Sequence, residues 1–242
     1  QFTFASSLAA SEFPAPGTVL NEQSPVDGKH PYARSKRQGE AMVAEFAGDF
    51  RTLIVRLGAV YSDWCEFTPL YTLLRTWSSP SWRQRILAGK GTAALPYIHV
   101  RDVVAFFARV LERVDVLGNG EVLIASPDQA TSHRQLFEGA MAALSDSHPQ
   151  PFLMPKALIR PGLHALGLLG KLSGEAPFEQ PWMADYVDKA MPVDASQTRQ
   201  RLSWEPNPRF GVLRRLPFLI ENQKTQAQEW HRRNMAAMKH VQ

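Results

Sequence analysis

The 242-residue sequence has little of several features that define large classes of protein. Cys65 is its only cysteine, so the chain has no internal disulfide and no cysteine-rich zinc module, which favours a reducing, cytoplasmic setting. The longest apolar stretch, residues 157–172, is interrupted by Arg160, Pro161 and Lys171 and is shorter than the roughly 20 apolar residues that a membrane span needs. No His, Cys, Asp or Glu cluster has the spacing of metal ligands, so we expect no membrane span and no metal.

An excess of charge of one sign is also missing from most of the chain. The formal net charge is +4, but residues 198–239 alone hold nine basic and three acidic side chains, a net of +6. A basic balance confined to one tail weakens a nucleic-acid reading of the whole protein. We therefore expect no nucleic-acid partner and interpret the tail as a solvated helical face.

What the sequence does have is an alternation of strand and helix patterns over its first 144 residues. Short apolar runs predict strands at 2–5, 51–61, 97–100 and 121–125, and the intervening patterns predict helices at 32–48, 101–113 and 131–144. Gly48 is expected to stop the first helix. Continuous apolar runs are typical of strands that are covered on both faces of a parallel sheet, so the sequence predicts an α/β fold.

Proline marks two further regions. Residues 11–31 hold four prolines and form a predicted loop of a length that is usually functional. From residue 148 onward, frequent prolines separate short helical patterns, which predicts a second, mostly helical region. We expect residues 1–147 to form the main domain, with 61–96 contributing to a substrate cleft, and 148–242 to form a substrate-binding region with a basic helical tail.

Tyr32 and Lys36 are the sharpest chemical signal, because side chains four residues apart share one face of a helix. The reference pKa of a phenol is about 10, so a tyrosine that acts as an acid or base near neutrality needs a neighbouring cation. An exposed helix pair without function is the alternative for this spacing. Ser6 and Ser7 end the first predicted strand upstream.

The order of motifs resembles a known family. The matching segments are Phe4-Ala5-Ser6-Ser7-Leu8-Ala9, the proline-rich loop with Glu22 and Pro25, Tyr32-x-x-x-Lys36 with Glu40, Arg56-Leu57-Gly58-Ala59-Val60-Tyr61 and Tyr97-Ile98-His99-Val100-Arg101-Asp102-Val103. This is the order in extended short-chain dehydrogenases/reductases, the NAD-dependent epimerase/dehydratase family. The resemblance covers residues 1 to about 140 and continues loosely to 193–206. It implies the carboxy-terminal portion of a Rossmann-type doubly wound parallel sheet, joined to a smaller, mostly helical substrate-binding region.

The resemblance also implies roles for individual residues. Tyr32 would be the general acid/base, Lys36 would hold the cofactor ribose and favour the phenolate, and Ser7 would bond the substrate oxygen, with Ser6 as the fallback. Such a family member is an NAD(P)-dependent oxidoreductase or epimerase/dehydratase that acts on a small carbonyl or hydroxyl substrate. The resemblance assigns cofactor binding to Ser6, Tyr32, Lys36, Gly58 and Ala59. It assigns substrate binding to Ser7, Leu8, Tyr61 and Trp64.

Two departures from the family pattern bear on the substrate. Nucleotide-sugar members usually have an asparagine where this chain has Ala59, and often an arginine where it has the segment Ala94-Leu95-Pro96-Tyr97. A nucleotide sugar would lose charge-assisted bonds of about 1.5–3 kcal/mol each at such positions. We therefore expect a less charged, more apolar carbonyl or hydroxyl compound.

Other candidate residues have competing interpretations. His99 lies on an apolar strand, so we interpret it as a structural histidine rather than a catalytic one. Cys65, Trp64 and Phe67 either line the substrate cleft or pack in the interior, and the sequence does not separate the two.

The Gly-rich turn that cradles a dinucleotide pyrophosphate does not occur in these 242 residues. We therefore expect a fragment that lacks the first cofactor-binding half, and the choice between NAD and NADP stays open. The first residues show no signal peptide. The sequence leaves open whether the protein forms a homodimer through the tyrosine-bearing helix. Two alternative functions also remain: an inactive NAD(P)-sensing protein, and a partner-docking module that uses the basic carboxy-terminal helix.

Overall fold

The computed structural model describes residues 1–145, 149–173 and 178–239. Its elements fall into two compact units that interleave along the chain. The first unit comprises residues 1–60, 95–130 and 190–212, and the second comprises 61–94, 131–189 and 213–242. The sequence predicts a domain boundary after residue 147, and the two compact units have different boundaries.

The first unit is built around a parallel sheet of three strands. Strand order is β1-β2-β7, and β2 lies in the middle. The bounds of the elements of this unit are β1 Phe2–Ser7, α1 Pro31–Glu45, β2 Thr52–Leu57, β3 Ala59–Tyr61, β6 Tyr97–His99, α3 Val100–Glu112, β7 Glu121–Ala125 and α6 Ser196–Leu202, with short 3-10 helices at Leu8–Ala10, Val114–Val116 and Pro208–Phe210. β3 ends one residue beyond the unit. The parallel pairing confirms the α/β fold that the sequence predicts.

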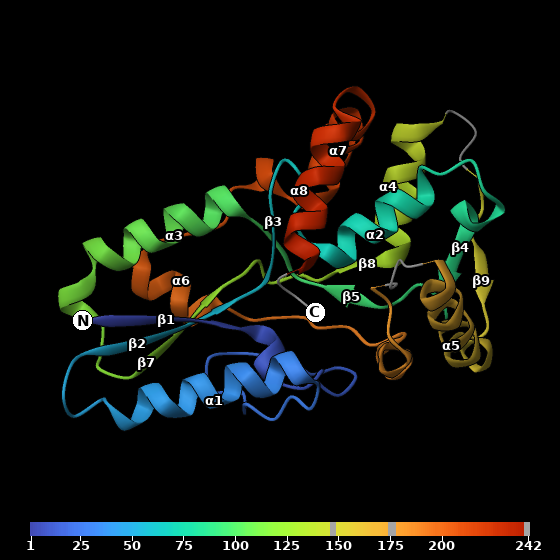
Figure 1. Ribbon diagram of the computed structural model, residues 1–242. Helices are drawn as coiled ribbons and strands as arrows, with labels where there is room; N and C mark the ends of the chain where they lie inside the picture. Colours follow the sequence, from blue (N-terminus) through green and yellow to red (C-terminus); the bar gives the residue numbers. More distant parts are fainter. Residues whose placement is uncertain (146–148, 174–177, 240–242) are drawn as a thin grey trace. The chain divides into compact units, whose positions relative to one another are not determined.

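Helices cover both faces of this sheet (Figure 1). Leu53 and Val55 of β2 point to one face, where they pack with Val103 and Phe106 of α3. The alternate residues of β2 point to the other face, along which α1 runs. Since side chains alternate along a strand, the continuous apolar run of β2 is what a strand with two covered faces requires.

Two sequence-based boundaries were wrong. The predicted strand 51–61 is broken at Gly58, where the chain leaves the β1-β2-β7 sheet and β3 pairs with β6 instead. A Cβ on Gly58 would lie 2.6 Å from the carbonyl oxygen of Pro96, so this close approach requires glycine. The first helix ends at Glu45 rather than at Gly48.

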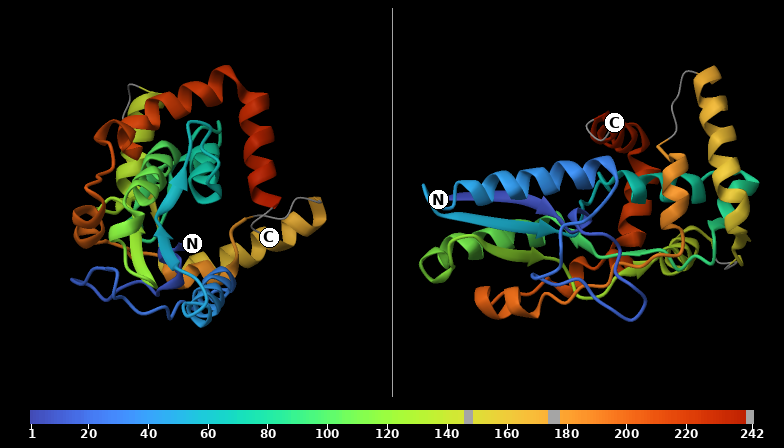
Figure 2. Two further views of the ribbon diagram at one scale, coloured as in Figure 1. Left: turned by 90° about the vertical axis from the view of Figure 1, so that its left-hand side faces the viewer. Right: turned by 90° about the horizontal axis from the view of Figure 1, so that it is seen from below.

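The second unit is mostly helical, as expected for the later part of the chain. Its elements are α2 Thr68–Trp77, a 3-10 helix Trp82–Arg85, β4 Ile86–Ala88, β8 Thr131–Ser132, α4 His133–Leu144, β9 Phe152–Met154, α5 Lys156–Ser173, a 3-10 helix Pro181–Tyr186, α7 Val212–Thr225 and α8 Ala227–Lys239. β5, Ala94–Leu95, lies at the boundary between the units. α7 starts one residue before the unit, and α7 and α8 meet at a sharp corner (Figure 2, left). Within the described residues, no helix combines the length and apolar character needed to cross a membrane.

Part of the positive charge of the basic tail is paired with carboxylates. Five of its arginines form ion pairs with carboxylates: Arg199 with Asp128, Arg201 with Glu121, Arg215 with Asp63, Arg232 with Glu229, and Arg233 with Glu66 and Glu229. Most of these partners lie far from the tail in sequence. Most of the described basic side chains of the tail are nevertheless exposed, as expected of a solvated face, although part of their charge is paired with carboxylates inside each unit.

Candidate active site

The carboxyl end of β1 brings together several residues that the sequence singles out. In parallel α/β sheets, ligands bind at the edge formed by the carboxyl ends of the strands. The pairing of β1 with β2 places Ser7 opposite Leu57, so Ser7 and Gly58 both lie at this edge. The backbone N–H groups of Gly58 and Ala59 donate to the carbonyls of Ala125 and Pro96 at 3.0 and 2.9 Å. The N–H groups of Gly58 and Ala59 are therefore both hydrogen-bonded to the backbone.

α1 runs back along β1, so its first turn lies by the carboxyl end of that strand (Figures 1 and 2). His30 caps the helix, its Nδ1 accepting from the N–H of Ala33 at 3.3 Å. Burial lowers the pKa of His30, partly opposed by the negative charge of Glu12, and this favours the neutral ring that can accept such a bond. Pro31 follows at the first helical position, where its missing N–H costs nothing. The cap and Pro31 thus place Tyr32 in the first turn.

Tyr32 and Lys36 lie together on the exposed part of α1. The phenol side chain of Tyr32 is 49% exposed, and the Lys36 Nζ lies 5.7 Å from the centroid of its ring. Lys36 Nζ also donates to the carbonyl oxygen of Ala5 in β1 at 2.9 Å. One ammonium therefore links the helix of Tyr32 to the strand that ends in Ser7.

The two serines at the end of β1 have different partners. Ser6 is buried and its hydroxyl donates to Glu40 Oε1. Ser7 is partly exposed, and its Oγ accepts from the backbone N–H of Ala9 at 3.2 Å. Because Ser7 Oγ is an acceptor there, its own O–H is available to donate, whereas the O–H of Ser6 is already used.

Glu40 and Arg56 form a buried ion pair that sequence reasoning did not assign to the site. The Arg56 Nε and Nη2 atoms donate to the two Glu40 oxygens at 3.1 and 3.0 Å, and both side chains are 6% exposed. Arg56 Nη1 also donates to the carbonyl of Ser24 at 2.8 Å, in the proline-rich loop. The sequence signal for this ion pair is Arg56, a single arginine within an apolar strand, because a buried charge needs a partner. The pair joins α1, β2 and, through Ser6, β1.

The three residues expected on the substrate side lie in different places. Leu8 is 2% exposed and packs in the core with Leu20 and Ile124, so only its backbone could contact a ligand. Tyr61 and Trp64 belong to the second unit, where Tyr61 is buried and Trp64 is partly exposed. Ser7, Tyr32, Lys36, Gly58 and Ala59 therefore belong to the first unit, and Tyr61 and Trp64 belong to the second.

His99 has the structural role that the sequence predicts. It is 1% exposed, its Nδ1 accepts from the N–H of Arg101 at 3.2 Å, and its ring stacks on Phe210 with centroids 4.9 Å apart. Cys65 packs in the interior of the second unit, where burial raises the pKa of its thiol. In the part of the chain that the structure describes, no group of three or more His, Cys, Asp or Glu side chains could hold a metal ion.

A parallel sheet with helices on both faces and polar side chains at the carboxyl end of its strands defines a Rossmann-like α/β protein. Comparison of sequences with family profiles matches residues 1–125 to the NAD dependent epimerase/dehydratase family. The chain belongs to this family. A comparison with curated proteins finds no match.

Solved structures share the fold of this chain. A structure titled gox2253 has a TM-score of 0.68 and 18% identity over 93% of this chain, and the UDP-glucose 4-epimerase of Thermotoga maritima has 0.65 and 17% over 93%. The dTDP-glucose 4,6-dehydratase of Bacillus anthracis, solved with NAD, has a TM-score of 0.63 and 14% identity over 94%. The match covers 66%, 64% and 62% of these three chains, so the present chain spans less than two thirds of their length.

Proposed function

We propose that this chain carries the acid/base residues of an NAD(P)-dependent enzyme that acts on a carbonyl or hydroxyl group, as an oxidoreductase or an epimerase/dehydratase. The observation that supports this most is the position of Lys36, which bonds Ala5 at the end of β1 and lies 5.7 Å from the Tyr32 ring. Lys36 thus links the helix that carries Tyr32 to the strand that ends in Ser7, and we assign the proton exchange to Tyr32.

The proton chemistry is assigned to two hydroxyl groups. Tyr32 gives a proton to the substrate oxygen, or takes one from it, as the oxygen changes between carbonyl and hydroxyl. Ser7 donates a second hydrogen bond to the same oxygen, because its O–H is available while its Oγ accepts from Ala9. Donors aimed at an oxygen that gains negative charge lower the barrier, and positioned acid/base groups contribute about 10²–10⁴ in rate.

The residues at this edge fit the nicotinamide end of the cofactor. NAD(P), when bound, supplies the acceptor or donor of the hydride. Lys36 is the group that would hold the ribose hydroxyls, because its ammonium has three donors and one of them reaches Ala5. Gly58 and Ala59 would line the nicotinamide with backbone atoms. The sequence contains no Gly-rich turn for the pyrophosphate, so we assign that part of the cofactor to residues outside these 242. The choice between NAD and NADP is left to the assay.

We propose a substrate that is less charged than a nucleotide sugar. Ala59 offers no side-chain polar group at the position where family members of that class have asparagine. The neighbouring structures named for UDP-glucose and dTDP-glucose enzymes make nucleotide sugars the natural comparison. A substrate panel therefore needs both classes.

The test uses the complete protein that contains this chain, with NAD and NADP and a panel of UDP-hexoses, dTDP-hexoses, ketones, aldehydes and alcohols. Net change in nicotinamide absorbance identifies an oxidoreductase. Product stereochemistry or loss of water without net absorbance change identifies an epimerase or dehydratase. We expect Tyr32→Phe to lower kcat by about 10²–10⁴ on the substrate that turns over.

Ser7→Ala and Ser6→Ala form a matched pair for this proposal. We expect Ser7→Ala to lower kcat with little change in thermal stability, and Ser6→Ala to lower stability because it removes the bond to Glu40. Undiminished turnover in Tyr32→Phe would refute the assignment of the acid/base. Turnover confined to UDP- or dTDP-hexoses would refute the substrate class and leave the acid/base assignment intact.

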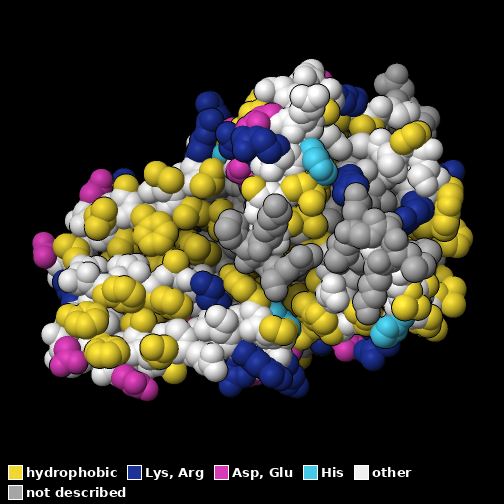
Figure 3. Space-filling view, in the orientation of Figure 1, with side chains coloured by type: hydrophobic (Ala, Val, Ile, Leu, Met, Phe, Trp, Pro, Cys, Tyr) yellow, Lys and Arg dark blue, Asp and Glu magenta, His cyan; other side chains and the backbone are white. Residues whose placement is uncertain are grey.

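Three further predictions belong with this proposal. We propose that Tyr61 and Trp64 bind substrate. We also propose a reducing, cytoplasmic setting, because the chain has a single cysteine. A homodimer is supported by the apolar side chains exposed on and just after α1, of which Met42 is 60% and Phe46 47% exposed. Apolar side chains gather on the face of the first unit shown in Figure 3. Sedimentation equilibrium of the complete protein measures the oligomeric state.

A further inference from the structure

The loop of residues 62–66 belongs to the second unit and directly follows β3. Its backbone is unusual. Cys65 and Glu66 have φ angles of 76° and 27°, in the left-handed region that few residues other than glycine adopt. Within the loop, Ser62 Oγ accepts from the N–H of Trp64 at 2.9 Å and donates to Glu66 Oε2 at 2.7 Å. Such a conformation persists only where surrounding contacts hold it.

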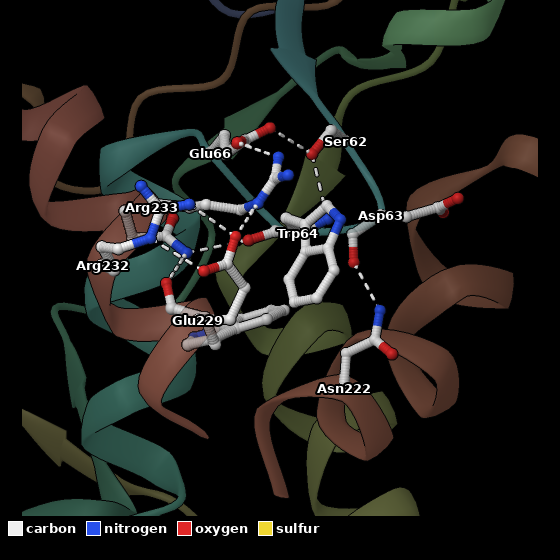
Figure 4. A network of polar contacts seen from close by, with 10 residues as sticks. Ser62, Asp63, Trp64, Glu66, Asn222, Glu229, Arg232 and Arg233 are labelled. Carbon is white, nitrogen blue, oxygen red and sulfur yellow. Dashed lines mark hydrogen bonds and ion pairs between the residues drawn. The ribbon is translucent and has the colours of Figure 1, made fainter. Parts of the chain in front are cut away.

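The carboxy-terminal helices supply those contacts (Figure 4). From α7, Asn222 Nδ2 donates to the carbonyl of Asp63 at 2.9 Å, and Arg215 pairs with the Asp63 carboxylate. From α8, Asn234 Nδ2 donates to the carbonyl of Trp64 at 2.8 Å. Both asparagines are among the buried residues. The loop is thus fixed by residues about 150–170 positions later in the chain.

Arg233 of α8 is the residue that contacts the Trp64 side chain. Its guanidinium carbon lies 4.8 Å from the centroid of a Trp64 ring, within the range of a cation–π contact. Its Nη1 donates to Glu66 Oε1 at 3.1 Å and its Nε donates to Glu229 Oε1 at 2.7 Å. Because the guanidinium is planar and bonded to two carboxylates, it offers the indole a support of fixed orientation.

The adjacent arginine provides an internal comparison. Arg232 donates to both oxygens of Glu229 at 2.8 and 2.6 Å, and its side chain is 69% exposed. In the described part of the chain, this ion pair lies within α8 and does not reach the loop. Two neighbouring arginines therefore share one carboxylate, and the contact to Trp64 belongs to Arg233.

We propose that Arg233 is a positioning residue that sets the orientation of the Trp64 indole, so that α8 acts as a specificity element for the substrate. The inference rests on the proposed function, in which Trp64 binds substrate. Its substrate class follows from the charges: Arg215 and Arg233, the arginines that reach the loop, already pair with Asp63 and Glu66. The loop therefore offers an indole face to an apolar or ring-shaped part of the substrate.

The experiment measures steady-state kinetics in the complete enzyme with the substrate that the panel identifies. We expect Arg233→Gln to raise KM at least 10-fold while kcat stays within about 2-fold, because the acid/base residues are unchanged. Arg232→Gln, the matched control, is expected to leave both constants unchanged. Arg233→Lys keeps the charge beside Glu66 but loses the planar contact, so its KM should fall between those of wild type and Arg233→Gln.

Two further measurements separate positioning from general loss of structure. In a Trp64→Phe background, Arg233→Gln should raise KM less than 3-fold further, because its effect passes through the indole. Hydrogen exchange of residues 62–66 should be faster in Arg233→Gln than in Arg232→Gln. An unchanged KM in Arg233→Gln, or an equal effect of Arg232→Gln, would overturn the inference. If Arg233→Gln leaves KM unchanged but Tyr32→Phe is inactive in the same series, the inference about Arg233 is refuted and the proposed function stands.

Discussion

The ion pair between Glu40 and Arg56 is the contact whose loss we expect to cost the first unit most. Both side chains are 6% exposed, and the carboxylate of Glu40 accepts from Arg56 Nε, Arg56 Nη2 and Ser6 Oγ. Glu40→Gln keeps one acceptor oxygen but turns the other into an NH₂ group that faces Nη2, a donor against a donor. It also leaves the guanidinium charge buried without a counter-charge.

The magnitude follows from that geometry. Removing one partner of a buried pair costs about 3–5 kcal/mol, which is a large part of the about 5–15 kcal/mol that stabilises a typical protein. Because the pair joins α1, β1 and β2, the loss should appear as earlier unfolding of the sheet with its helix. Urea unfolding followed by circular dichroism measures it. Glu45→Gln, at an exposed position of the same helix, is the control and should change the free energy of unfolding by less than about 0.5 kcal/mol.

An apolar pair tests whether the cost comes from the unpaired charge. We expect the double variant Glu40→Met, Arg56→Met to be more stable than Glu40→Gln, because no charge remains buried without a partner. If Glu40→Gln unfolds within about 1 kcal/mol of Glu45→Gln, the pair contributes little and the reasoning is refuted.

Two other substitutions test packing and pH dependence. A Cβ on Gly39 of α1 would lie 2.3 Å from the ring of Phe4. Gly39→Ala should therefore destabilise the protein by about 1–3 kcal/mol, although alanine has the better helix propensity. Gly48 has open space around it, so Gly48→Ala should change the melting temperature very little. Equal melting temperatures for the two would contradict this. Burial, partly opposed by Asp188, lowers the pKa of His133 from 6.5 to about 4. Between these two pH values the unfolded chain binds a proton that the folded chain does not. This contribution to stability is therefore present above pH 6.5, and about 3 kcal/mol is lost as the pH falls from 6.5 to 4. His133→Gln should flatten that slope in urea unfolding, and an unchanged slope would exclude His133 as its source.

The catalytic proposal rests on local sequence more than on packing. Tyr32 and Lys36 share a helical face because of their spacing, and the cap at His30 with Pro31 starts that helix. The apolar run within 51–61 predicts a buried parallel strand, and the pairing of residues 52–57 with β1 on one side and β7 on the other confirms it for that part. These features depend on periodicity over a few residues, which is visible in the sequence itself.

Other features depend on pairing between distant segments. Ser6 and Arg56 are opposite one another in the parallel register, and Glu40 reaches both from the helix, but no local pattern specifies that register. The strand break at Gly58 likewise depends on the bonds that Gly58 and Ala59 make to Ala125 and Pro96, which lie later in the chain. Hydrophobic periodicity states which face of an element is buried, but it does not state which element covers that face.

The sequence by itself therefore determined the α/β class, the family, the acid/base candidates on α1 and the order of the elements. Tertiary structure alone decided which serine has an available O–H, which charges are buried together, and which arginines of the basic tail are paired with carboxylates. The physical reason is range: capping, helical spacing and strand alternation act over a few residues. The partners of Ser6, Arg56 and Arg233 lie 34, 16 and 167 positions away, and only the folded chain brings them within hydrogen-bond distance.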